Sequence, residues 1–109
     1  TPGAVLIGWG PRPLGVDIEA AARATTYIQR LPLLVEIGAA TGVGPVAAFT
    51  LVEAALKALG RGPRSVKGLR LDHVDSDGSC VFTVADPATI RAAVVAIPER
   101  YVGSVAVVD

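Results

Sequence analysis

The stretch VKGLRLDHVDSDGSCVFTVA, residues 66–85, decides the fold that this sequence predicts. Two strand-like runs, residues 66–74 and 79–85, flank the tetrapeptide DSDG at residues 75–78. Acidic residues followed by glycine, placed between two such runs, are a strong signal for a tight turn. We therefore expect residues 66–85 to form an antiparallel hairpin.

The residues after the hairpin predict a short helix and a last strand. An Asp-Pro pair at residues 86–87 is typical of a helix start, and Pro98 should end the helix. The apolar residues between them recur at helical spacing: Ile90, Val94 and Ile97. The apolar run GSVAVV at residues 103–108 predicts a strand.

Two segments before the hairpin complete a recognisable pattern. Residues 33–37 form a short apolar run and predict a strand. Residues 45–59 predict the clearest helix, because proline suits its first turn and Gly60 suits the position beyond its end. The apolar stripe of this helix is continuous: Val46, Phe49, Val52, Leu56 and Leu59. From residue 33, the order strand, helix, strand, strand, helix, strand is the split βαβ pattern of a ferredoxin-like α+β fold.

A further strand and helix are expected ahead of this pattern. The apolar run at residues 3–8 predicts a strand, and the following proline-rich residues predict a loop. Asp17 suits the N-cap of a helix that extends to about residue 29. We therefore divide the chain into an N-terminal strand–helix extension, residues 1–32, and a ferredoxin-like domain, residues 33–109.

The composition favours self-association. Of the 109 residues, 51% are hydrophobic and 18% are charged, and the mean hydropathy is +0.53. A domain of this size buries only a modest fraction of its surface, so the surplus apolar residues must lie outside. Contiguous apolar patches on a protein surface usually bind partners. We expect the principal partner to be further copies of the same chain.

The charge balance and the cysteine count narrow the function classes. Ten basic and ten acidic residues cancel and the pI is near 6.5, which leaves no electrostatic footprint for nucleic acid or an anionic membrane. The longest apolar stretch, residues 45–59, is interrupted by charges and is shorter than the ~20 residues that a spanning helix needs. A single cysteine cannot form an internal disulfide, and the opening TPGAVLIGWG lacks a basic leader, so we expect a cytoplasmic protein.

A cysteine and a histidine occupy matching positions of the predicted hairpin. His73 and Cys80 are expected to face each other across the two strands, and such a pair can act as base and nucleophile. No third residue or oxyanion donor accompanies them, and a cysteine within SCVFTV is typical of a core position. We therefore expect no catalytic residue and no enzyme, and keep a small Cys/His enzyme as the third alternative.

No metal or cofactor site is expected. The acidic residues Asp72, Asp75 and Asp77 lack the bidentate acid of a calcium loop, because Val84 occupies that position. Glycine-rich junctions at residues 8–15 and 38–45 match neither the dinucleotide fingerprint nor the P-loop. They support the second alternative, a small regulatory or ligand-binding domain that binds a small anion near Arg12 or residues 42–44.

The single tryptophan, Trp9, is flanked by Gly8 and Gly10. An aromatic side chain in such a loop can anchor a ligand or a neighbouring subunit. It can equally cover the core, and the sequence leaves both possibilities open.

Three stretches resemble the shell-protein (BMC) domain of bacterial microcompartments. LLVEIGAATGVGPVAAFTLVEAALKAL, residues 33–59, resembles the first strand, loop and alanine-rich helix of that family. LRLDHVDSDGSCVFTVADPATI, residues 69–90, is similar to its hairpin and the start of its second helix. GSVAVVD, residues 103–109, is similar to its last strand.

The resemblance implies a structural role. It implies a cyclic hexamer or pseudohexamer that tiles, alone or with other shell proteins, into a microcompartment shell crossed by a small-metabolite pore. By position, the pore would be lined by Asp75, Ser76, Asp77 and Gly78, and Lys57 would lie at the tile edge. No cofactor is implied. Two aspartates per subunit would form an acidic ring that attracts cations and resists anions.

Overall fold

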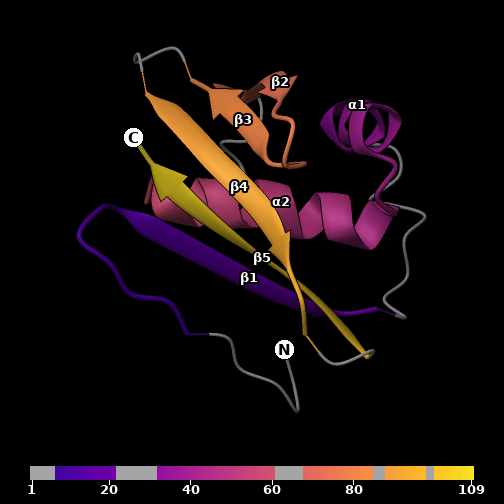
Figure 1. The fold of residues 1–109 in the computed structure, drawn as a ribbon, viewed down its shortest axis with the longest axis horizontal. Helices are drawn as coiled ribbons and strands as arrows, with labels where there is room; N and C mark the ends of the chain where they lie inside the picture. Colours follow the sequence, from indigo (N-terminus) through magenta and orange to yellow (C-terminus); the bar gives the residue numbers. More distant parts are fainter. Residues whose placement is uncertain (1–6, 22–31, 61–67, 85–87, 98–99) are drawn as a thin grey trace.

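The computed structural model describes residues 7–21, 32–60, 68–84, 88–97 and 100–109. Its five strands form one antiparallel sheet, in the order β1-β5-β4-β3-β2. Both helices contribute to a single core with that sheet, so the protein is an α+β domain (Figure 1). The elements are β1 (Leu14–Ala20), α1 (Pro32–Thr41), α2 (Pro45–Ala58), β2 (Arg70–Val74), β3 (Cys80–Thr83), β4 (Thr89–Val95) and β5 (Tyr101–Val108).

The predicted hairpin is confirmed over residues 70–83, and the predicted central helix is confirmed as α2. Residues 66–67 and 85 of the predicted hairpin lie outside the described residues. β2 and β3 pair antiparallel around residues 75–78, where the Asp75 N–H donates to the Ser79 carbonyl over 2.9 Å. Gly78 has a φ of +87°, in the left-handed region that favours glycine. α2 begins at Pro45 and ends at Ala58, and Gly60 follows with a φ of +72°. Both elements therefore form where turn and cap residues mark them.

The strand predicted at residues 33–37 is wrong, because these residues lie in α1. Leu34 and Ile37, three positions apart, are buried in the core, whereas Val35 and Glu36 between them are exposed. That spacing follows the helical period of 3.6 residues and not the alternation of a strand. The short apolar run was therefore one face of a helix.

The helix predicted after Pro87 is also wrong, because residues 89–95 form β4. Ile90 and Ala92 are buried and Arg91 between them is exposed, which is the alternation of a strand with one face on the core. Ile90 and Val94 are four positions apart, a spacing that fits both periods. Residues 89–95 form a strand and not a helix because β4 pairs with β3 on one side and with β5 on the other.

The helix predicted to start at Asp17 is wrong over the residues that the structure describes. Asp17 lies in the middle of β1 and is buried, rather than capping a helix. The rest of that predicted helix, beyond residue 21, lies outside the described residues. Of the strand predicted at residues 3–8, residues 7 and 8 are not in a strand and residues 3–6 lie outside the described residues.

The ferredoxin-like topology is not confirmed. The described elements run strand, helix, helix, and then four strands, which differs from the split βαβ order. β2 to β5 form a meander of antiparallel neighbours, and β1 joins it by pairing with β5. β1 therefore brings residues 14–20 into the same sheet as the C-terminal strand.

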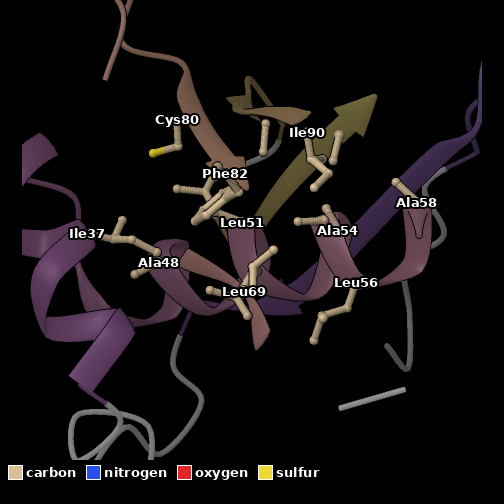
Figure 2. Packing of buried hydrophobic residues seen from close by; sticks show 14 of the residues in the cluster. Ile37, Ala48, Leu51, Ala54, Leu56, Ala58, Leu69, Cys80, Phe82 and Ile90 are labelled. Atoms are coloured by element: carbon tan, nitrogen blue, oxygen red, sulfur yellow. The ribbon is translucent and has the colours of Figure 1, made fainter. Parts of the chain in front are cut away.

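The core lies between α2 and one face of the sheet. α2 packs against β1, β5 and β4, and α1 packs against α2 and β2. Figure 2 shows apolar side chains of the two layers converging on the space between them. The largest fully buried apolar side chains are Phe82, Ile37, Leu56 and Ile90. This layer holds the fold together through the burial of apolar surface.

Gly15 sets how closely β1 approaches α2. A Cβ at this position would lie 2.0 Å from the carbonyl oxygen of Ala54 and 2.4 Å from the amide nitrogen of Ala58. Only glycine leaves room for this contact between a strand and a helix backbone.

Within the part of the chain that the structure describes, no single helix is long and apolar enough to cross a bilayer. The helices α1 and α2 meet the length and hydropathy criteria only when taken together, and they are bent by 112° at the break between them.

Candidate functional site

The face of the sheet that points away from α2 carries an open surface. In β4 and β5, Ala92 and Ala106 point to the core, so their neighbours Ala93, Val105 and Val107 point to the opposite face. These three side chains are only partly buried. Among the described residues, no helix covers this outer face, and Figure 1 shows α2 behind the strands.

A groove of about 310 Å³ is hollowed into this outer face. Its floor is apolar and its walls are charged, and we call it the sheet-face groove. It is lined by Arg12, Ser79, Arg91, Ala93, Val105, Val107 and Asp109. The lining combines β4 and β5 with the segment that leads into β1, so distant parts of the chain build it together.

Each arginine of the groove pairs with an aspartate. Nη1 of Arg12 lies 3.3 Å from Oδ1 of Asp109, and the guanidinium of Arg91 pairs with Asp75. All four side chains are at least partly exposed, so each ion pair contributes little to stability. The pairs do, however, neutralise the groove. An apolar occupant with a polar rim therefore fits it better than a free anion does.

The segment before β1 lies over the outer face. A Cβ on Gly8 would come within 2.8 Å of Leu14 Cδ2 and 2.9 Å of Val16 Cγ1, so the backbone at Gly8 rests on these two side chains. Next to this contact, Trp9 is 87% exposed and Ile7 is 74% exposed. Of the two possibilities that the sequence left open for Trp9, covering the core is therefore wrong.

The turn that joins β2 and β3 carries Asp75 and Asp77, and we call it the acidic turn. His73, in β2, lies between two aspartates beside it. Its Nδ1 lies 2.6 Å from Oδ2 of Asp72, and its Nε2 lies 3.0 Å from Oδ1 of Asp75. Asp77 accepts a hydrogen bond of 2.9 Å from the Ser79 amide, and hydrogen bonds from Ser79 hold the pKa of this carboxyl below its usual value. Among the described residues, no group of three or more His, Cys, Asp or Glu side chains is placed to hold a metal ion.

The structure does not bring His73 and Cys80 together. A β-bulge between Leu71 and His73 shifts the register, so His73 pairs with Val81, and Cys80 pairs with Val74. Cys80 consequently points into the core, where it is fully buried, while His73 is exposed. Burial raises the pKa of the Cys80 thiol, which disfavours the reactive thiolate. The geometry of a nucleophile and its base is therefore missing from this pair.

The four residues predicted to line a pore border a second hollow, of about 430 Å³. Asp75, Ser76, Asp77 and Gly78 form one wall, and residues of α1, α2, β2, β4 and the loop between the two helices form the rest. Ser76, Asp77 and Gly78 are exposed. Their role in a pore, and the metabolite that would cross it, remain predictions.

Lys57, predicted to lie at an interface between subunits, makes a contact within the chain. Its Nζ lies 2.7 Å from Oδ1 of Asp17, so it ties the end of α2 to the middle of β1. The Lys57 side chain is still half exposed. A role at a tile edge therefore remains a prediction.

The groove residues Arg91 and Asp109 were missed by sequence reasoning. Arg12 and Asp109 are 97 positions apart, and no local pattern joins them. The one available signal was the alternation in TIRAAVV at residues 89–95, which places Arg91 opposite the buried Ile90 and Ala92 once the segment is taken as a strand. The groove became visible only with the correct strand order.

The described fold and surface define an α+β domain with helices on one face of an antiparallel sheet and a neutral groove on the other. Comparisons of the chain with family models and with curated proteins give no match.

Proposed function

We propose that this protein is a structural, non-catalytic domain that acts by associating with copies of itself. The observation that supports this best is the one-sided sheet. α2 covers one face, and the opposite face presents Ala93, Val105 and Val107 with no described helix above them. An uncovered sheet face with an apolar centre is a candidate surface for a partner.

The electrostatics favour a like partner over other classes. The chain carries no net charge, and each arginine at the groove is already paired with an aspartate. Nucleic acid and anionic membranes require an excess of basic residues on the contact surface. A surface that carries both charge signs around an apolar centre is complementary to itself, as a two-fold interface requires.

The shell component of a bacterial microcompartment is the narrower form of this proposal. It would place the exposed turn at Ser76, Asp77 and Gly78 around the opening of a cyclic hexamer or pseudohexamer. The support for this form is the sequence resemblance of residues 33–59, 69–90 and 103–109. The ferredoxin-like order expected with that resemblance is not confirmed, so the broader self-association is the primary proposal.

The mass of the particle in solution tests the proposal directly. Sedimentation equilibrium and light scattering over a wide concentration range should show a mass that rises from the 11.1 kDa monomer to a defined multiple. A monomer at every concentration would remove both forms of the proposal. Six subunits in native mass spectra, with sheets or tubes in negative-stain images, would support the shell form. A closed dimer would contradict the shell form and leave self-association standing.

A second candidate function has one specific observation in its favour. The 430 Å³ hollow beside the acidic turn is large enough for a small molecule, and it combines apolar Val43, Leu51 and Val94 with polar Thr41 and Ser76. A thermal-shift screen against a metabolite panel checks it, because a ligand that binds only the folded state raises the melting temperature. No shift with any compound at millimolar concentration would argue against this candidate.

A further inference from the structure

We infer that Trp9 of one copy inserts into the sheet-face groove of a second copy, and that the two copies exchange this contact across a two-fold axis. The inference rests on the proposed self-association and identifies the surface that carries it. Trp9 is the only tryptophan of the chain, and it is 87% exposed. An exposed indole is an unusual use of the largest apolar side chain, and tryptophan is enriched among the residues that dominate binding energy.

The backbone positions this side chain on the correct face. Gly8 rests on Leu14 and Val16, which point away from α2, so the segment is seated on the outer side of β1. Arg12, three positions beyond Trp9, is a wall of the groove. Figure 1 shows the segment as the indigo trace that leads into β1. Anchor and groove therefore belong to the same face of the molecule.

The groove has the chemistry that an indole requires. Ala93, Val105 and Val107 give a floor of small apolar side chains, and the volume of about 310 Å³ is on the scale of one large aromatic side chain. The guanidinium groups of Arg12 and Arg91 stand at the walls, where they can stack on an aromatic face. Both keep their aspartate partners in this arrangement, so no charge has to be left unpaired.

A second copy of the chain offers a groove for the exposed Trp9 and an exposed Trp9 for the groove. In this structure Trp9 projects into solvent and not into the groove of its own chain. Because anchor and groove lie on one face, a two-fold axis lets both indoles enter both grooves at once. With the axis close to the groove, the Arg12–Asp109 pairs of the two copies would lie near each other, and their opposite charges could interact across the interface.

Intrinsic fluorescence provides the direct test, because Trp9 is the only tryptophan. As the concentration rises, the emission maximum should shift to the blue and quenching by acrylamide should weaken. Both changes should follow the same concentration dependence as the particle mass. An emission maximum that stays at the solvent-exposed value while the mass increases would overturn the inference and leave the proposed self-association intact.

Matched variants test the two sides of the contact. Trp9→Ala should weaken association by roughly tenfold or more, the scale of a hot-spot residue, and Trp9→Phe should retain part of the affinity. Ala93→Leu, which fills the groove floor, should weaken association to a similar degree while circular dichroism confirms that the variant folds. Val35→Ala removes another exposed apolar side chain, 59% exposed on α1, and should change the affinity by less than about twofold.

Three other outcomes would overturn the proposed contact between Trp9 and the groove of a second copy. Association that is unaffected by Trp9→Ala places the interface elsewhere and overturns the inference alone. A blue-shifted emission that does not depend on concentration, in a particle of monomer mass, places the indole in its own groove and overturns the second-copy arrangement. An exposed tryptophan in a particle that is monomeric throughout overturns both this inference and the proposed function.

Discussion

Thr50 and Ser104 place two hydroxyl groups in the middle of the apolar layer between α2 and β5. Their oxygens are 2.8 Å apart, and both residues are fully buried. The Thr50 hydroxyl also donates to the Ala47 carbonyl over 2.8 Å, so the Ser104 hydroxyl must be the donor in the contact between the two. The pair fixes the position of α2 on the sheet more specifically than apolar contacts do.

Because Ser104 donates to Thr50 and Thr50 donates to Ala47, removal of the two hydroxyls should have different effects on stability. Thr50→Val removes the acceptor and leaves the buried Ser104 hydroxyl without this partner, so we expect it to lower the free energy of unfolding by about 1–3 kcal/mol. Ser104→Ala leaves Thr50 bonded to Ala47 and should cost about 0.5–1.5 kcal/mol. Urea unfolding of the two single variants and the double variant measures this. Costs that simply add in the double variant would show that the two hydroxyls are not coupled.

At the scale of elements, the contact of β1 with α2 depends on Gly15. We expect Gly15→Ala to destabilise the protein by about 1–3 kcal/mol, because the new methyl group would meet the α2 backbone at Ala54 and Ala58. Thermal unfolding followed by circular dichroism measures the change. Gly10→Ala is the matched control, since a Cβ there meets no atom within 4 Å. Equal effects of the two substitutions would contradict this account of the packing.

The hairpin turn carries a pH-dependent contribution through Asp77. Its pKa is lowered in the folded state by hydrogen bonds from Ser79, so the ionised carboxylate stabilises the fold. This stability is fully present above the usual aspartate pKa and is lost as pH falls through the lowered folded value. Asp77→Asn should therefore be less stable than wild type near neutral pH, and the difference should shrink as the pH falls below the usual aspartate pKa of about 4. A difference that is constant with pH would exclude the carboxylate charge as its cause.

The elements also show how far the sequence determines the fold. α2 and the β2–β3 hairpin were predictable because proline and glycine mark their limits. α1 and β4 were exchanged in type, because short apolar runs fit both periods until their neighbours are known. The assignment of β4 as a strand depends on its pairing with β3 and β5, which is tertiary information.

The candidate site was less predictable than the fold. The sequence offered two roles for Trp9, an anchor or a cover for the core; its exposure excludes the second, and the first stays a prediction. The sheet-face groove is assembled from β4, β5 and the segment before β1, so it exists only after the strands are ordered. A one-residue bulge moved Cys80 and His73 to opposite faces, and bulges have no strong local sequence signal.

At the scale of the whole molecule, a neutral protein with one apolar face should associate with little help from long-range charge. We expect the dissociation constant of the self-association to change by less than about threefold between roughly 0.05 M and 0.5 M salt, because the groove arginines are already paired. Sedimentation equilibrium at several salt concentrations measures it. A steep loss of affinity with salt would mean that charge attraction, and not burial of the indole and the groove floor, drives the association.

The pairing of β1 with β5 has a mechanical consequence. Leu14, where the chain enters β1, lies opposite Val107, just before the chain leaves β5. Hydrogen bonds between antiparallel strands run across the strands, so a pull on the two outer segments loads these bonds along their length and one after another. Under tension the ladder between β1 and β5 would open from Leu14 toward Ala20, and the contacts of β1 with α2 would then be the ones that resist further separation. A partner bound across β1 and β5 would then oppose the separation of these two strands.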